Sequence, residues 1–125
     1  MSAAATFVRE NRDRHLNELM EVLRIPSVST DPARAGEVKR AAAWVKARLD
    51  RAGCSKTEIF ETKRHPIVYG EWLGAPGLPT ILIYGHYDVQ PEDPVDLWTS
   101  PAFQPTVRDG RLYARGACDE KGLFI

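Results

Sequence analysis

The chain has 125 residues, enough for one domain with a real core and too few for two comfortable ones. Its 43% hydrophobic and 27% charged residues are ordinary for a soluble globular protein. The 17 lysine and arginine residues balance 17 aspartate and glutamate residues, which argues against a nucleic-acid partner or an anionic membrane. We therefore expect a small-molecule or peptide partner.

The cysteines and the chain ends add to this description. Cys54 and Cys118 cannot form a disulfide framework and have no CxxC spacing, so a reduced, cytoplasmic setting is expected. The first residues lack the pattern of a signal peptide, and no apolar run approaches the roughly 20 residues that span a bilayer. The sequence stops on "DEKGLFI", whereas natural ends are usually polar. We expect a fragment of a longer protein.

Two helices are predicted in the first half of the chain. Residues 7–24 carry an apolar stripe at helical spacing, formed by Leu16, Leu19, Met20 and Leu23. Pro26 and Pro32 interrupt this pattern. A second helix should follow, with Asp31 as its cap and Gly53 at its end. Its apolar face consists of Val38, Ala42, Val45 and Leu49.

Strands are predicted after the helices. The stretches "KTEIFE" and "IVYGEWL" alternate in polarity, whereas "TILIY", residues 80–84, is continuously apolar. Such a run predicts a strand buried on both faces of a sheet that helices cover. A weaker hairpin is predicted in "PTVRDGRLYARG", with Asp109-Gly110 as a two-residue turn. Two helices followed by strands favour an α/β domain.

A histidine and an aspartate stand where the apolar run ends, in "YGHYDVQP". Side chains of an extended segment alternate, so His86 and Asp88 should point to the same side. Gly85 before them lets a ligand or backbone approach closely. One imidazole nitrogen could bind a metal while the other donates to the carboxylate. The alternative is a satisfied polar pair at a strand end.

A second set of polar residues lies in "GRLYARGACDEKG". Asp119 follows a glycine-punctuated turn, and Gly122 with Leu123 indicates the first turn of another helix. Asp119 is either a capping residue with exposed neighbours or a carboxylate ligand that bridges two metal ions.

The two motifs together, "LIYGHYDVQP" and "LWTSPAFQPTVRDGRLYARGACDEKG", resemble the consecutive signatures of the M20 family of zinc metallopeptidases. "LRIPSVST" is similar to the exit of the first helix in that family. The resemblance runs over nearly the whole chain, and the "GHYDVQP" wording is most similar to the dipeptidase branch related to carnosinase. It implies that residues 1–125 are the N-terminal portion of one catalytic domain of zinc-peptidase, phosphorylase/hydrolase-like fold.

The resemblance also implies roles for single residues. His86 would bind one zinc ion and Asp119 would bridge two. Asp88 would belong to the catalytic machinery as the carboxylate that steadies His86. Glu120 lies where the family has an acidic or amide residue, and the peptide bond between Asp119 and Glu120 is expected to be cis.

Other parts of the family pattern have no match in this chain. The family has a Glu-Glu pair further along, of which one member is the general base, together with an additional acidic ligand and a late histidine. Its inserted lid domain, used for dimerisation and substrate capture, is also missing. Cys118 stands where the family usually has a small residue such as serine or threonine.

The resemblance therefore implies metal-dependent hydrolysis of dipeptides by a dinuclear zinc site of which this chain carries part. Manganese or cobalt suits similar ligands. We expect the isolated chain to be inactive and the full-length protein to be a homodimer without nucleic-acid or membrane partners. Two alternatives stay open: an N-acyl amino acid deacylase similar to acetylornithine deacetylase or succinyl-diaminopimelate desuccinylase, and a non-catalytic module that retains the fold.

Overall fold

The structure is a computed structural model that describes residues 2–124. It divides into two compact units. One is formed by Met1–Arg24 together with Glu92–Ile125, and the other by Ile25–Pro91. Helices precede short strands, so the predicted α/β class is confirmed. None of the helices within residues 2–124 is long and apolar enough to cross a membrane.

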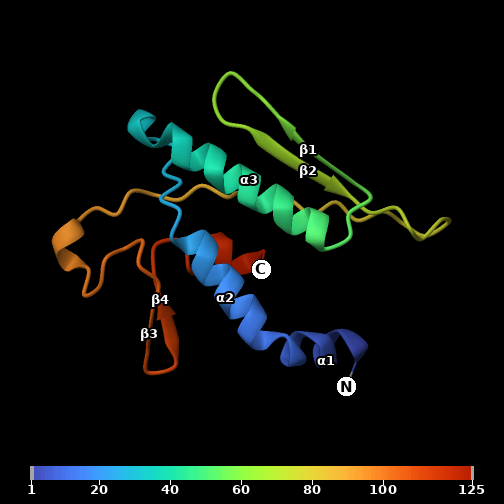
Figure 1. The fold of residues 1–125 in the computed structure, drawn as a ribbon, viewed down its shortest axis with the longest axis horizontal. Coiled ribbons are helices and arrows are strands. Elements are labelled where there is room, and N and C mark those ends of the chain that lie inside the picture. Colours follow the sequence, from blue (N-terminus) through green and yellow to red (C-terminus); the bar gives the residue numbers. More distant parts are fainter. Residues whose placement is uncertain (1, 125) are drawn as a thin grey trace. The chain divides into compact units, whose positions relative to one another are not determined.

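The Ile25–Pro91 unit is built on one long helix and a hairpin. The Asp31 side chain accepts from the Ala33 amide at 2.9 Å and caps the short helix η1 (Pro32–Arg34), which leads into α3 (Ala35–Arg51). Strands β1 (Lys56–Phe60) and β2 (Ile67–Glu71) pair in antiparallel register from Lys56↔Glu71 to Phe60↔Ile67. Figure 1 shows α3 lying along this hairpin, as the contacts between them require.

Helix α3 ends and packs as its sequence predicts. Gly53 follows it with φ 91°, in the left-handed region that favours glycine. Val38 and Ala42 of the predicted face are buried. A Cβ on Gly70 would lie 2.9 Å from Cδ1 of Leu49, so the absence of a side chain at this position of β2 lets the helix approach the hairpin closely.

The first predicted helix is divided in two. Helix α1 (Ala3–Glu10) and helix α2 (Arg12–Leu23) meet at Asn11, whose φ of −103° and ψ of 13° leave the helical region. The side-chain amide of Asn11 donates to the Phe7 carbonyl oxygen at 2.9 Å, and its backbone amide donates to the same oxygen at 3.0 Å. Local side-chain bonds of this kind are typical of asparagine at helix ends. The predicted apolar stripe lies entirely in α2, where Leu23 is fully buried and its other members are half-buried. Val22, which was not part of that stripe, is fully buried as well.

The remaining part of the first unit is rich in loops. Strands β3 (Thr106–Arg108) and β4 (Arg111–Tyr113) form the second predicted hairpin. Both turn residues have positive φ, 49° at Asp109 and 73° at Gly110, as a type I′ turn requires. Two further helical turns are η2 (Val95–Leu97) and η3 (Lys121–Leu123), and η3 packs against α2.

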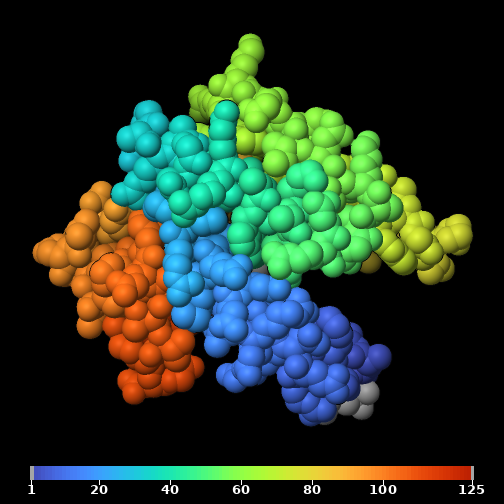
Figure 2. Space-filling model, viewed as in Figure 1, coloured from blue at the N-terminus to red at the C-terminus, as the bar shows by residue number. Residues whose placement is uncertain are grey.

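The buried strand predicted for "TILIY" is wrong for this chain. Within residues 2–124 the two sheets are β1–β2 and β3–β4, and residues 80–84 belong to neither. Ile81, Leu82, Ile83 and Tyr84 are 82–91% exposed. A run of this kind is buried only between neighbouring strands and under helices, and no described segment takes those positions. Figure 2 shows the preceding yellow segment projecting beyond the green hairpin.

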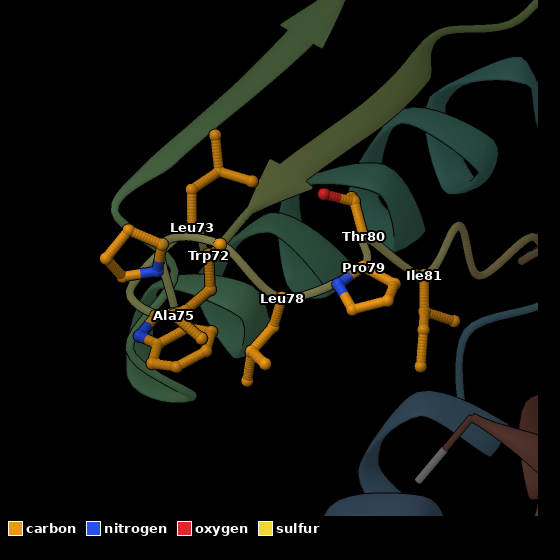
Figure 3. A pocket seen from close by; sticks show the side chains of 9 residues that line it. Trp72, Leu73, Ala75, Leu78, Pro79, Thr80 and Ile81 are labelled. Atoms are coloured by element: carbon orange, nitrogen blue, oxygen red, sulfur yellow. The ribbon is translucent and has the colours of Figure 1, made fainter.

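The predicted strand "IVYGEWL" also ends early, because β2 stops at Glu71. Trp72 and Leu73 are 62% and 60% exposed, and the Trp72 ring folds back over Gly74, where a Cβ would lie 2.5 Å from Cζ2. This loop encloses an open hollow of about 400 Å³ running from Trp72 to Ile81 (Figure 3). Its lining side chains carry no charge, so it offers no acid, base or metal ligand.

Candidate metal centre

The imidazole and the carboxylate predicted after the apolar run lie side by side. Nδ1 of His86 is 3.0 Å from Oδ1 of Asp88. A carboxylate at this distance favours the tautomer with the proton on Nδ1, which places the lone pair on Nε2. Both side chains are accessible, at 40% and 36%. The arrangement is the one in which a histidine binds a metal while a carboxylate fixes its orientation.

The Asp88 carboxylate is itself held from another part of the unit. Ser29 Oγ donates a hydrogen bond to Oδ2 of Asp88. The Ser29 carbonyl oxygen lies 2.8 Å from Nε2 of His65. His86 is therefore oriented by a carboxylate whose second oxygen is also bonded.

The backbone brings these two segments together. Val28 and Val89 form a parallel bridge, in which the Val89 amide donates to the Ser27 carbonyl oxygen at 3.0 Å. The Ser27 hydroxyl returns a bond of 2.8 Å to the Tyr87 carbonyl oxygen and is fully buried. Ser29 directly follows Val28 and Asp88 directly precedes Val89, so this pairing brings the two residues close enough for their side chains to bond.

Tyr87 lies between His86 and Asp88 in the chain and anchors the segment on its other side. Its hydroxyl donates to the Pro66 carbonyl oxygen. Partial burial raises the pKa of the Tyr87 phenol to about 12, and the negative charges of Asp88 and Glu61 act in the same direction. The phenol therefore stays protonated at neutral pH and keeps its donor.

The second motif lies in the other unit. The peptide bond between Asp119 and Glu120 is cis, as the resemblance implied. Asp119 is exposed and Glu120 is half-buried. The residue at the N-cap of η3 is Glu120, and its side chain makes no capping hydrogen bond. Asp119 precedes this N-cap by one residue, and its role as a metal ligand stays a prediction.

The structure brings together His86 and Asp88, while Asp119 belongs to the unit that contains the chain's last residues. A common site for His86 and Asp119 stays a prediction. The chemistry of the donors fits a divalent cation, since imidazole nitrogen and carboxylate oxygen are ligands of zinc, manganese and cobalt.

Two residues near the predicted ligands had no signal of their own in the sequence. Ser29 lies in a proline-flanked loop, and its contact with Asp88 spans 59 residues of chain. Lys121 follows two acidic residues, where exposure is expected, yet it is fully buried. Only the resemblance of "LRIPSVST" to the family's helix exit pointed to the region of Ser29.

Known proteins are similar to this chain over the residues that carry the two motifs. The profile of peptidase family M20/M25/M40 matches residues 82–125. A cysteinylglycine-S-conjugate dipeptidase of Corynebacterium striatum is 38% identical over 115 residues, covering 92% of this chain and 25% of its own length. A succinyl-diaminopimelate desuccinylase of Xylella fastidiosa is 40% identical over 98 residues, covering 78% of this chain and 23% of its own length.

A solved structure supports the fold. Human carnosine dipeptidase 1 matches with a TM-score of 0.83 and 29% identity, over 94% of this chain and 27% of its own. The chain belongs to the M20 family of metallopeptidases, whose members use divalent metal ions. It spans about a quarter of the length of the curated relatives it matches.

Proposed function

We propose that this chain carries part of the active site of a two-metal hydrolase that cleaves the peptide bond of dipeptides. The observation that carries the proposal is the 3.0 Å contact between Nδ1 of His86 and Oδ1 of Asp88, in a chain that belongs to the M20 family. His86 and Asp119 are the proposed ligands, and zinc is the expected metal. Manganese and cobalt suit the same donors.

Each proposed residue has a defined task. His86 presents Nε2, and Asp88 fixes the tautomer and the ring plane. Asp119 would supply the carboxylate ligand shared by the two cations. When bound, two divalent cations polarise the scissile carbonyl group and lower the pKa of the attacking water. A general base from outside the matched motifs must take the proton from that water.

Dipeptides are favoured over N-acyl amino acids as substrates, because the dipeptidase relative aligns over a larger share of this chain than the desuccinylase relative does. The dipeptidase relative aligns over 92% of this chain, whereas the desuccinylase relative aligns over 78%. Identity does not separate the two classes, at 38% and 40%. An N-acyl amino acid deacylase is therefore the second candidate, and both would cleave an amide bond with the same metal chemistry.

The isolated chain is proposed to be inactive. It offers two of the proposed ligands, whereas zinc is usually held by about four. Dimerisation and substrate capture are proposed to belong to a longer protein. Turnover of dipeptides by the purified 125-residue chain with excess zinc would contradict this part of the proposal.

Calorimetric titration of the chain with zinc tests the site itself. His86→Gln and Asp119→Asn should each weaken binding at least tenfold, because each removes one ligand. His15→Gln, a histidine substitution in α2, is the matched control and should leave the affinity unchanged. Equal affinity in all four proteins would overturn the site and favour a non-catalytic module. If binding falls as expected, assays of the longer protein on dipeptides and on N-succinyl amino acids separate the two candidate hydrolases.

A further inference from the structure

A fully buried lysine lies directly after the two acidic residues of the second motif. Lys121 has 0% exposure, and its Nζ donates to the Val22 carbonyl oxygen at 3.0 Å. The two residues are 99 positions apart in the sequence and lie in the same unit. An ammonium group is rarely buried completely, because it loses its hydration, so such a lysine needs a specific partner.

The partner is the end of a helix. Val22 is the last residue but one of α2 (Arg12–Leu23), and the final carbonyl groups of a helix form the negative end of its dipole. Val22 and Leu23 are fully buried as well, which lowers the local dielectric constant and strengthens the attraction for the ammonium group. Lys121 therefore joins the end of α2 to η3.

The turn that carries the acidic residues is held close to this junction. The Leu123 amide donates to the Glu120 carbonyl oxygen at 2.7 Å, which closes η3. A Cβ on Gly122 would lie 2.0 Å from the Ala117 carbonyl oxygen, so the backbone folds back tightly on both sides of Asp119. The Lys121 bond to α2 is therefore made from within a short, tightly folded turn.

We propose that Lys121 is a positioning residue that fixes the Asp119–Glu120 turn to the end of α2 and so directs the Asp119 carboxylate toward the metal. This inference rests on the proposed function in one respect, that Asp119 binds metal. It assigns to α2 a part in metal binding although α2 contributes no ligand. In this role the lysine acts through its hydrogen bond to the Val22 carbonyl oxygen.

Cobalt(II) titration, followed by the visible absorption band, tests the inference. Lys121→Met keeps the unbranched apolar part of the side chain up to the ε position but removes the ammonium group. We expect cobalt to bind at least tenfold more weakly and the band at saturation to shift, under conditions where circular dichroism shows the variant folded. Lys39→Met, which changes an exposed lysine of α3, should bind like the unmodified chain.

A second variant covers the case in which Lys121→Met does not fold. Lys121→Gln keeps a donor but is one atom shorter, so it reaches Val22 only if the turn moves, and several-fold weaker binding is expected. If either folded variant matches the unmodified chain in affinity and band, Lys121 supports stability alone and the inference is overturned. If the unmodified chain does not bind cobalt, the result contradicts the proposed metal site itself and not the role of Lys121.

Discussion

The hydroxyl group of Ser29 donates a hydrogen bond to Oδ2 of Asp88, while Oδ1 of the same carboxylate lies 3.0 Å from Nδ1 of His86. The carboxylate that orients the imidazole is thus held by a serine 59 residues before it in the sequence. Groups of this kind, which hold a ligand without touching the metal, typically change metal affinity about 10- to 100-fold when removed.

The first prediction is that Ser29→Ala weakens zinc binding about tenfold, because the Asp88 carboxylate loses one of its donors. Calorimetric titration of the chain gives the affinity. Ser55→Ala is the control, since Ser55 donates to the Glu71 carbonyl oxygen at 3.0 Å on an exposed part of the hairpin. A variant without Ser29 that binds zinc as tightly as the control would show that Asp88 orients His86 unaided.

The second prediction concerns the tight turn around Asp119. Gly122→Ala should lower the free energy of unfolding by about 2–3 kcal/mol, because the new Cβ meets a backbone oxygen that cannot move as a side chain would. Gly36→Ala should instead raise it by about 0.5 kcal/mol, since Gly36 lies in α3 with nothing within 4 Å of its added Cβ. Urea unfolding compares the two, and equal effects would contradict the packing described for Gly122.

The third prediction is a dependence on alkaline pH. Because the folded pKa of Tyr87 is raised from 10.0 to about 12, the folded state binds more protons than the unfolded state between these values. The stability linked to this group is fully present below pH 10 and is lost as the pH rises through about 12. Tyr87→Phe should therefore show a flatter fall of stability over this range than the unmodified chain. Urea unfolding at a series of pH values measures the difference, and identical slopes would contradict the assignment.

The fourth prediction follows from the exposure of the apolar run. Leu82 is 91% exposed, so Leu82→Lys should change the free energy of unfolding by no more than about 0.5 kcal/mol. It should also reduce self-association, because an uncharged, extended apolar segment can pair with another chain. Sedimentation velocity and urea unfolding give the two quantities.

The control is Leu23→Lys, which places a charge at a fully buried position and should unfold the chain. If Leu82→Lys were as destabilising as this control, Leu82 would be buried in solution.

Local signals were sufficient for the turns and helix ends. Gly53 and the Asp109-Gly110 pair have the positive φ values that their sequence context predicted, because these conformations depend on neighbouring residues alone. Asp31 caps a helical turn for the same reason, although this turn is η1, which leads into α3, and not the first turn of α3 itself. The break at Asn11 was not predicted, because the expected helix of residues 7–24 rested on an apolar stripe that begins only at Leu16 and therefore does not test the chain around Asn11.

The sequence did not predict burial correctly where burial depends on segments far away in the chain. The composition of residues 80–84 describes a strand that needs neighbours on both sides, and composition cannot tell whether a given chain provides them. The burial of Lys121 depends on a helix end 99 residues earlier, so its sequence context alone predicted an exposed side chain. His86 and Asp88 were found because they are close in sequence, while Ser29 was not.

The parallel bridge between Val28 and Val89 has a consequence for the order of folding. Closing a loop of this length carries an entropic penalty of several kcal/mol, about 4 by the logarithmic law, which must be met before Ser29 can restrain Asp88. An unfolded chain therefore presents His86 as an ordinary, freely rotating imidazole. A cation that prefers the restrained ring would bind after the unit has folded and would stabilise the folded state. Metal availability would therefore change the rate of unfolding more than the rate of folding.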